Sequence, residues 1–413
     1  MRAHQENPYA ALQVRDFRNF IIGRLFVSLA IMVQAVVVGW QVYEITKDPL
    51  SLGLIGLAEA IPAITVSLYA GHLADVVQRK KIILVCVLTL AFCSLALLYF
   101  TMNIGSSVLA HGALPIYTVI FISGIARGFL SPANFSFMPQ LIDRELYQNA
   151  IVWNSTLWEA AAVGGPIIGG LVYGFYGITA AYSVDAALVL AGLCCLVLVP
   201  NRPLPPISEE QGIFDKIKAG IKFVFKNQII LSAISLDLFA VLFGGAVALL
   251  PIFADEILHV GKEGLGFLRA SQGIGAVIMA VYITRNPIKK NMGKILLGCV
   301  AGFGLCMIGF GVSKLFWLSM GLLILSGMFD CVSVIARSTL IHTLTPENMK
   351  GRVSAVNSIF IGSSNEIGSF ESGVAAKLLG VVPSVIFGGL MTLGVVGITG
   401  WKAEKLRKLD RLS

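Results

Sequence analysis

Long apolar segments recur along the whole sequence and constrain the fold more than any other feature. Residues 82–99 are uncharged throughout, and residues 182–199 carry Asp185 as their one charged side chain. As α-helices, segments of this length can cross about 30 Å of hydrocarbon. Of the 413 residues, 56% are hydrophobic and 13% are charged, whereas soluble domains carry roughly 25% charged residues. The sequence therefore predicts a membrane protein.

The apolar segments favour helices over a membrane β-barrel. Barrel strands would be about ten residues long, with alternating polar and apolar side chains. Here the apolar segments are continuous, without alternating polar residues, and they contain many glycine and alanine residues. Such small residues are typical of packed membrane helices. We therefore expect an all-α membrane protein.

Charged residues, glycine and proline divide the apolar sequence into twelve expected transmembrane helices. The first six are expected near 17–45, 52–74, 81–101, 114–138, 149–175 and 178–199, and the second six near 228–254, 264–284, 292–312, 315–341, 352–378 and 381–401. The predicted domains are thus an N-terminal six-helix bundle (1–199), a cytoplasmic linker (200–227) and a C-terminal six-helix bundle with a basic tail (228–413). The linker ends in a basic amphipathic segment, which predicts a helix at the membrane surface.

Lysine and arginine side chains gather at one end of the expected spans. Of these residues, 23 lie at that end, and four lie at the opposite end, namely Lys47, Lys262, Lys314 and Lys377. Because lysine and arginine resist translocation, we expect a multi-pass protein of a bacterial inner (cytoplasmic) membrane with both termini in the cytoplasm. The formal charge of +8 follows from this topology and does not indicate nucleic-acid binding.

The two halves of the sequence are related by a weak internal repeat. Residues 124–155 align without a gap with residues 327–358 at an offset of 203, and further on Gly170 aligns with Gly373. At an offset of 213, Gly53 aligns with Gly266. Because both halves begin and end on the same side, the repeat is parallel, with an axis along the membrane normal. The substrate is then expected between the halves near the midplane.

Two short motifs indicate where helices approach closely and where a gate could close. The loop after the second span carries Gly71, Asp75, Arg79 and Lys80, in which glycine permits a tight approach and the charges can form a breakable ion pair. The fifth span carries a second motif, consisting of Gly165, Pro166, Gly169 and Gly170. Proline frees a carbonyl, and the glycines allow close helix contact.

These motifs resemble those of the major facilitator superfamily. The loop is similar to its G-x-L-a-D-r-x-x-r-k signature, and the fifth span is similar to the G-P-x-x-G-G motif of its antiporters. Residues 17–24, 49–56 and 345–352 resemble the branch that contains the enterobactin exporter and macrolide-type drug:proton antiporters. The resemblance implies two pseudo-twofold-related six-helix bundles and proton-coupled export of a small amphiphilic drug or siderophore by alternating access.

Ionisable side chains within the expected spans are the candidates for substrate binding or proton coupling, because charge in the bilayer is costly unless it faces a partner or water. The ionisable candidates are Arg24, Glu59, Arg127, Glu159, Asp237, Asp330, Arg337 and Glu366, and the polar Gln34 is a further candidate for the lining. Arg127 and Asp330 occupy equivalent repeat positions, and we expect them to face each other across the pseudo-twofold axis. Structural ion pairs between helices are the alternative for each charged residue. Asp185 and Arg269 are expected nearer the interface.

Several classes of function find no support in the sequence. It lacks the phosphate-binding G-x-x-x-x-G-K-[ST] loop and the G-x-S-x-G and H-E-x-x-H motifs, and its five histidines are scattered. The seven cysteines lie within apolar segments, so we expect neither an enzyme nor a cofactor or metal site. The expected partners are a small-molecule substrate, protons and the lipid bilayer, and the chain is expected to be a monomer. Two alternatives to export stay open: an uptake carrier for a nutrient or metal ion, and a membrane receptor of the same fold that does not transport.

Overall fold

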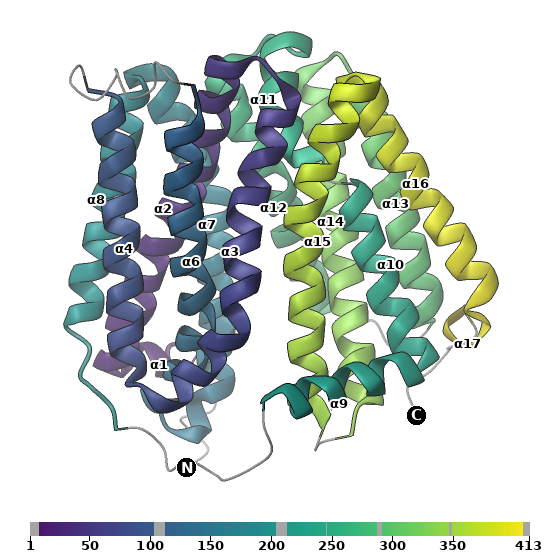
Figure 1. Cartoon of the computed structure of the whole chain (residues 1–413). Helices are drawn as coiled ribbons and strands as arrows, with labels where there is room; N and C mark the ends of the chain where they lie inside the picture. The colour runs from purple at the N-terminus through teal and green to yellow at the C-terminus, as the bar shows by residue number, and fades with distance from the viewer. Residues whose placement is uncertain are drawn as a thin grey trace. The chain divides into compact units, whose positions relative to one another are not determined.

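The computed structural model describes residues 8–102, 112–203, 213–244, 246–286, 291–346 and 349–407, and throughout these residues the fold is helical (Figure 1). In this part of the chain, ten helices are long and apolar enough to cross a membrane. Two further helices, α7 and α15, are each 30 residues long but are not among the ten. The predicted all-α membrane fold is confirmed, while the number of twelve spans stays a prediction.

The long helices begin and end close to the predicted segments. Those of the first half are α2 (Arg15–Thr46), α3 (Pro49–Val76), α4 (Arg79–Phe100), α6 (Leu114–Phe137), α7 (Tyr147–Tyr176) and α8 (Ile178–Val197). Those of the second half are α10 (Gln228–Gly244), α12 (Gly261–Arg285), α13 (Met292–Val312), α14 (Phe316–Leu344), α15 (Lys350–Leu379) and α16 (Val381–Lys402). Shorter helices are α1 (Ala10–Gln13), α9 (Ile213–Lys226), α11 (Leu250–Ile252) and α17 (Glu404–Arg407).

Two glycines end helices at equivalent positions of the repeat. Gly177 follows α7 with a φ of 86°, and Gly380 follows α15 with a φ of 93°. A side chain would be strained in this conformation, which glycine adopts readily. The two glycines are 203 positions apart, the offset at which the sequence repeat was found. The repeat therefore extends to the backbone of these turns.

Close packing divides the chain into two units. Unit one comprises Met1–Lys47, Ala58–Ser208 and Gly261–Ala270, and unit two comprises the rest: Asp48–Leu57, Glu209–Val260 and Ser271–Ser413. In two places, the start of a helix lies in the unit that is formed mainly by the other half of the sequence. The start of α3 packs within unit two, and the start of α12 packs within unit one.

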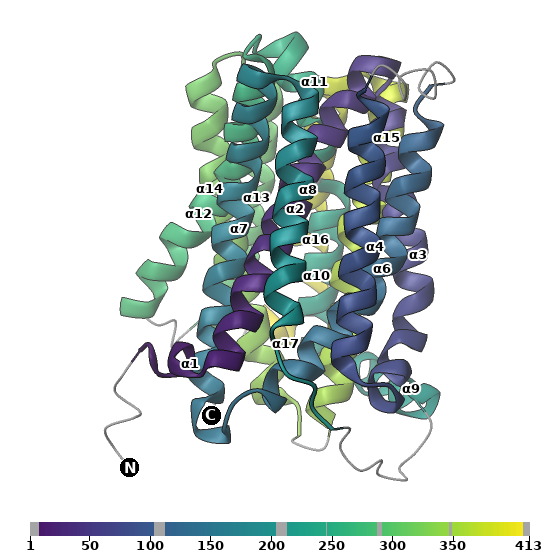
Figure 2. The same cartoon turned by 90° about the vertical axis from the view of Figure 1, so that its left-hand side faces the viewer.

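Each unit has its own apolar interior. In unit one, α2 packs between α7 and α8 (Figure 2), and Phe17, Phe20 and Ile83 are fully buried. In unit two, Leu236 of α10 and Leu296 of α13 are fully buried. Because lipid tails are as apolar as leucine, van der Waals contact between helices has to hold such bundles together.

Two close helix contacts involve glycine pairs that the repeat relates to each other. In unit two, a Cβ atom added to Gly373 of α15 would lie 2.9 Å from the Cα atom of Gly53 in α3. In unit one, a Cβ atom added to Gly170 of α7 would lie 2.6 Å from the Cα atom of Gly266 in α12. Gly53 aligns with Gly266 and Gly170 with Gly373. The sequence repeat thus corresponds to two equivalent contacts, each within one unit.

Candidate functional site

A small cavity in unit two brings two carboxylates together. It is lined by residues of α10, α13 and α14, namely Asp237, Ala240, Val241, Cys299, Val300, Phe303, Phe329, Asp330 and Ser333. Its interior offers about 10 Å³ to the centre of a water-sized sphere, which is close to the minimum of about 10–15 Å³ needed to hold one water molecule. The cavity is therefore better suited to water or a proton than to an organic molecule.

A buried ion pair lies at this cavity. Arg337 of α14 pairs with Asp237 of α10, and only 2% and 7% of their side chains are exposed. Asp330, Ser333 and Arg337 lie on one face of α14, because they are spaced by three and four residues. The structure thus brings together three of the predicted site residues, namely Asp237, Asp330 and Arg337.

Three charged candidates of unit one, Arg24, Glu59 and Arg127, form contacts within that unit. Arg127 of α6 pairs with Glu59 of α3, and Arg24 of α2 donates a hydrogen bond to Oδ1 of Asn154 in α7. Sequence reasoning named Arg127 and Glu59 but did not foresee this pairing. The predicted approach of Arg127 to Asp330 stays a prediction.

Asp185, which the sequence analysis expected nearer the interface, is 1% exposed. It lies on the face of α8 that packs against α2. Gln34 of α2 donates to its Oδ2 atom at 3.3 Å, whereas Oδ1 has no hydrogen-bond partner among the described residues. One turn away, the Tyr182 hydroxyl donates to Oε1 of Gln41 at 2.5 Å.

A lysine at the start of α12 joins three helices of unit one. The ammonium group of this residue, Lys262, lies 3.1 Å from Oε1 of Glu44 in α2. It also lies 4.3 Å from the ring centroid of Tyr173 in α7. The Tyr173 hydroxyl also donates to Oε2 of Glu44, at 2.8 Å. Arg269, which we had also expected at the interface, lies further along α12 and donates to the carbonyl of Ala35 at 2.7 Å.

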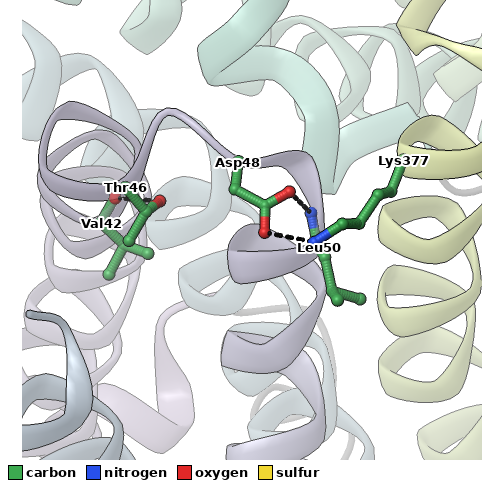
Figure 3. Close-up of polar contacts among 5 residues, drawn as sticks. All are labelled: Val42, Thr46, Asp48, Leu50 and Lys377. Carbon is green, nitrogen blue, oxygen red and sulfur yellow. Dashed lines mark hydrogen bonds and ion pairs between the residues drawn. The ribbon is translucent and has the colours of Figure 1, made fainter.

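A second lysine contact lies at the start of α3, in unit two (Figure 3). Lys377 of α15 donates to Oδ2 of Asp48 at 3.1 Å, and Oδ1 of Asp48 accepts the backbone N–H of Leu50 at 3.3 Å. We call the Lys262–Glu44 and Lys377–Asp48 pairs the lysine ties. Sequence reasoning missed both ties, although Lys262 and Lys377 are two of the four lysines assigned to the sparsely charged side.

The basic residues of the loop motif bind the ends of helices. Arg79 donates to the carbonyl of Ser136 at 3.1 Å, and Lys80 donates to the carbonyl of Val197 at 3.0 Å. Cations at helix C-termini also interact favourably with the helix dipole. Gly71 lies within α3, while the side chain of Asp75 is outside the described residues. The predicted gating ion pair therefore stays a prediction.

The glycines of the fifth span allow the close approach that the sequence predicted. Added Cβ atoms on Gly165 and Gly169 would lie 3.1 Å from the carbonyl oxygens of Leu29 and Val33 in α2, respectively. Gly170 faces α12 instead. Helix α7 is continuous through Pro166.

Two candidates lie outside these clusters. Glu159 is half-buried on α7 and forms no ion pair within the described part of the chain. The side chain of Glu366 lies outside the described residues. Across the described residues, no group of three or more His, Cys, Asp or Glu side chains is placed to hold a metal ion.

Helices long and apolar enough to span a membrane, with an internal repeat and ion pairs between them, define a class, that of polytopic membrane proteins. Within that class, residues 6–412 match the family described as transmembrane secretion effectors, and the chain belongs to this family of the major facilitator superfamily. The resemblance inferred from the motifs is confirmed. The chain is accordingly a membrane transporter and not an enzyme.

Curated relatives and solved structures agree with this assignment. The enterobactin exporters of Shigella dysenteriae serotype 1 (strain Sd197) and Escherichia coli O1:K1 / APEC are each 25% identical to the chain over 386 residues, covering 92% of the chain and 90% of the exporter. A bacterial homologue of the iron transporter ferroportin, in an inward-facing state, superposes with a TM-score of 0.71 at 18% identity, covering 95% of this chain and 99% of that one. The peptide transporter PepTSo of the POT family gives 0.73 at 12% identity, with coverages of 95% and 98%. The solved structures support the fold alone.

Proposed function

We propose that this chain is a secondary active exporter of small amphiphilic molecules of the siderophore or drug class, driven by protons and working by alternating access. Relatives named enterobactin exporters cover 92% of the chain, which supports the substrate class and the direction. The proposal includes a bacterial inner-membrane location with both termini in the cytoplasm, as the distribution of lysine and arginine indicates.

The observation that carries proton coupling is the buried Asp237–Arg337 pair at the cavity lined by Asp330. Removing the charge of one partner from a buried pair leaves the other uncompensated, at a cost of about 3–5 kcal/mol. Protonation of Asp237 would therefore favour any arrangement of α10 and α14 in which Arg337 finds water or another anion. A proton that binds one conformation better than another shifts the equilibrium between them.

The lysine ties and the glycine contacts support alternating access. Each tie is a partly exposed ion pair, with 31% and 40% of the side chains exposed in Lys262–Glu44 and 51% and 31% in Lys377–Asp48. Such pairs contribute about 0–1 kcal/mol and break readily. The glycine contacts beside them bring helix backbones together without an intervening side chain. The lysine ties can therefore open and close at small cost in free energy.

Transport in proteoliposomes tests the proposal. With the purified chain reconstituted, an imposed pH gradient should drive movement of enterobactin, and a matched preparation without a gradient should show only slow equilibration. Asp237→Asn and Asp330→Asn should each abolish the acceleration by the gradient. Asp143→Asn, which removes an exposed carboxylate between two short 3-10 helices, should leave it intact.

Two outcomes would contradict the proposal. If the gradient changes nothing in the unaltered protein, the chain is not proton-coupled. If the gradient still accelerates transport in both the Asp237 and the Asp330 variants, the coupling site lies elsewhere. Drug-class amphiphiles in the same assay would reveal whether the substrate class extends beyond siderophores.

A further inference from the structure

The helix α9, in the segment that joins the two sequence halves, is anchored to unit two by one face. It packs against α10 and α15 and lies crosswise near one end of these helices (Figure 1). Val224 is fully buried in an apolar cluster with Ile230 of α10 and Val353 of α15. This anchoring fixes which side chains α9 presents to its surroundings.

The opposite face of α9 exposes apolar and basic side chains next to each other. Ile221 is 40% exposed and Phe225 is 60% exposed, and Lys218, Lys222 and Lys226 are exposed as well. With about 100° between successive residues, the lysines form one strip along the helix. Ile221 and Phe225 form a neighbouring strip, which lies between the lysines and the buried Val224 face.

The three lysines form no ion pair with any residue that the structure describes. Because their side chains are exposed, these lysines can bind an external anion. A partner that fits has to offer an apolar portion to Ile221 and Phe225 and, directly beside it, negative charge to the lysines. Phospholipids with anionic headgroups have this arrangement, because the phosphate is joined through glycerol to the acyl chains, and basic amphipathic helices bind them at the membrane surface.

We propose that the exposed face of α9 is a docking surface for anionic phospholipids. Headgroup phosphates bind Lys218, Lys222 and Lys226, while the upper acyl chains pack against Ile221 and Phe225. Because Val224 joins α9 to α15, a bound lipid also braces the end of α15 against movement. This proposal does not depend on which substrate the chain transports.

Native mass spectrometry of the purified full-length chain tests the proposal. After incubation with phosphatidylglycerol or phosphatidylcholine, the unaltered chain should retain phosphatidylglycerol preferentially. The triple variant Lys218→Gln, Lys222→Gln, Lys226→Gln should lose that preference, with about fivefold weaker binding for each lysine removed. The matched control is Lys314→Gln, Lys402→Gln, Lys405→Gln, which removes the same charge from exposed positions outside α9.

The apolar strip is tested separately. Ile221→Ser with Phe225→Ser should weaken retention of both lipids, and both residues are exposed, so the fold should persist. In nanodiscs, phosphatidylglycerol should also slow hydrogen exchange of the α9 amides relative to phosphatidylcholine. The proposal is overturned if the α9 triple variant retains phosphatidylglycerol as the unaltered chain does. It is equally overturned if the control loses as much, because net charge alone would then explain binding.

Discussion

At the scale of single residues, burial distinguishes the Asp237–Arg337 pair from the Glu59–Arg127 pair. The former side chains are 7% and 2% exposed, and the latter are 19% and 30% exposed. A buried charge that loses its partner costs far more than one that water still reaches. The two pairs should therefore respond differently to the same kind of substitution.

We expect Arg337→Met to destabilise the protein by about 3–5 kcal/mol, because it leaves Asp237 buried without its cation. The double variant Arg337→Met, Asp237→Asn should recover most of this loss. Arg127→Met is the matched control and should cost clearly less, because the Glu59–Arg127 pair is less buried. Thermal unfolding in detergent measures all three, and equal losses for Arg337→Met and Arg127→Met would contradict the distinction.

Asp185 provides the opposite case, a buried carboxylate with no cation partner among the described residues. Asn at this position keeps the shape and can still accept the hydrogen bond from Gln34. Because it removes a buried negative charge that has no cation beside it in this part of the structure, Asp185→Asn should leave the unfolding temperature unchanged or raise it. A marked fall would show that the negative charge itself is needed.

At the scale of helices, the sequence was sufficient to predict most elements and insufficient to predict their partners. Hydropathy located the long helices, and the glycine motif predicted that α7 packs closely. The sequence could not predict that Arg127 meets Glu59 or that Asp185 turns toward α2, because both depend on how each helix is rotated about its axis. The pairing of Lys377 with Asp48 could not be predicted either, because 329 positions of the chain separate the two residues.

The glycines of α7 allow a matched test of close packing. Gly170→Ala should destabilise the protein by about 1–3 kcal/mol, because its methyl group would overlap the backbone of Gly266. Gly164→Ala, on the same helix, would place its methyl group 3.7 Å from Leu29 and should be neutral or stabilising by up to about 1 kcal/mol. The unfolding temperatures of the two variants test this prediction. Equal changes in unfolding temperature would contradict the role assigned to Gly170.

At the scale of the whole molecule, the lysine ties predict a charge-exchange phenotype. Lys377→Glu and Asp48→Lys should each reduce transport, because like charges then face each other at the start of α3. Combining them should restore transport, since the ion pair re-forms with its charges exchanged. Lys314→Glu, at an exposed position, is the control, and transport assays alongside unfolding temperatures separate function from folding. Failure of the double variant to recover would argue against an ion-pair tie.

The start of α3 belongs to unit two and the start of α12 belongs to unit one, and this affects how the chain folds during synthesis. Unit one includes residues 261–270, so its packing stays incomplete until the ribosome has produced α12. Unit two likewise needs residues 48–57, which emerge long before the rest of it. Domains generally fold as units during synthesis. We therefore expect that, until α12 has been synthesised, Gly170 and Glu44 lack their contacts with Gly266 and Lys262. Neither half of the sequence should therefore be stable when it is expressed without the other.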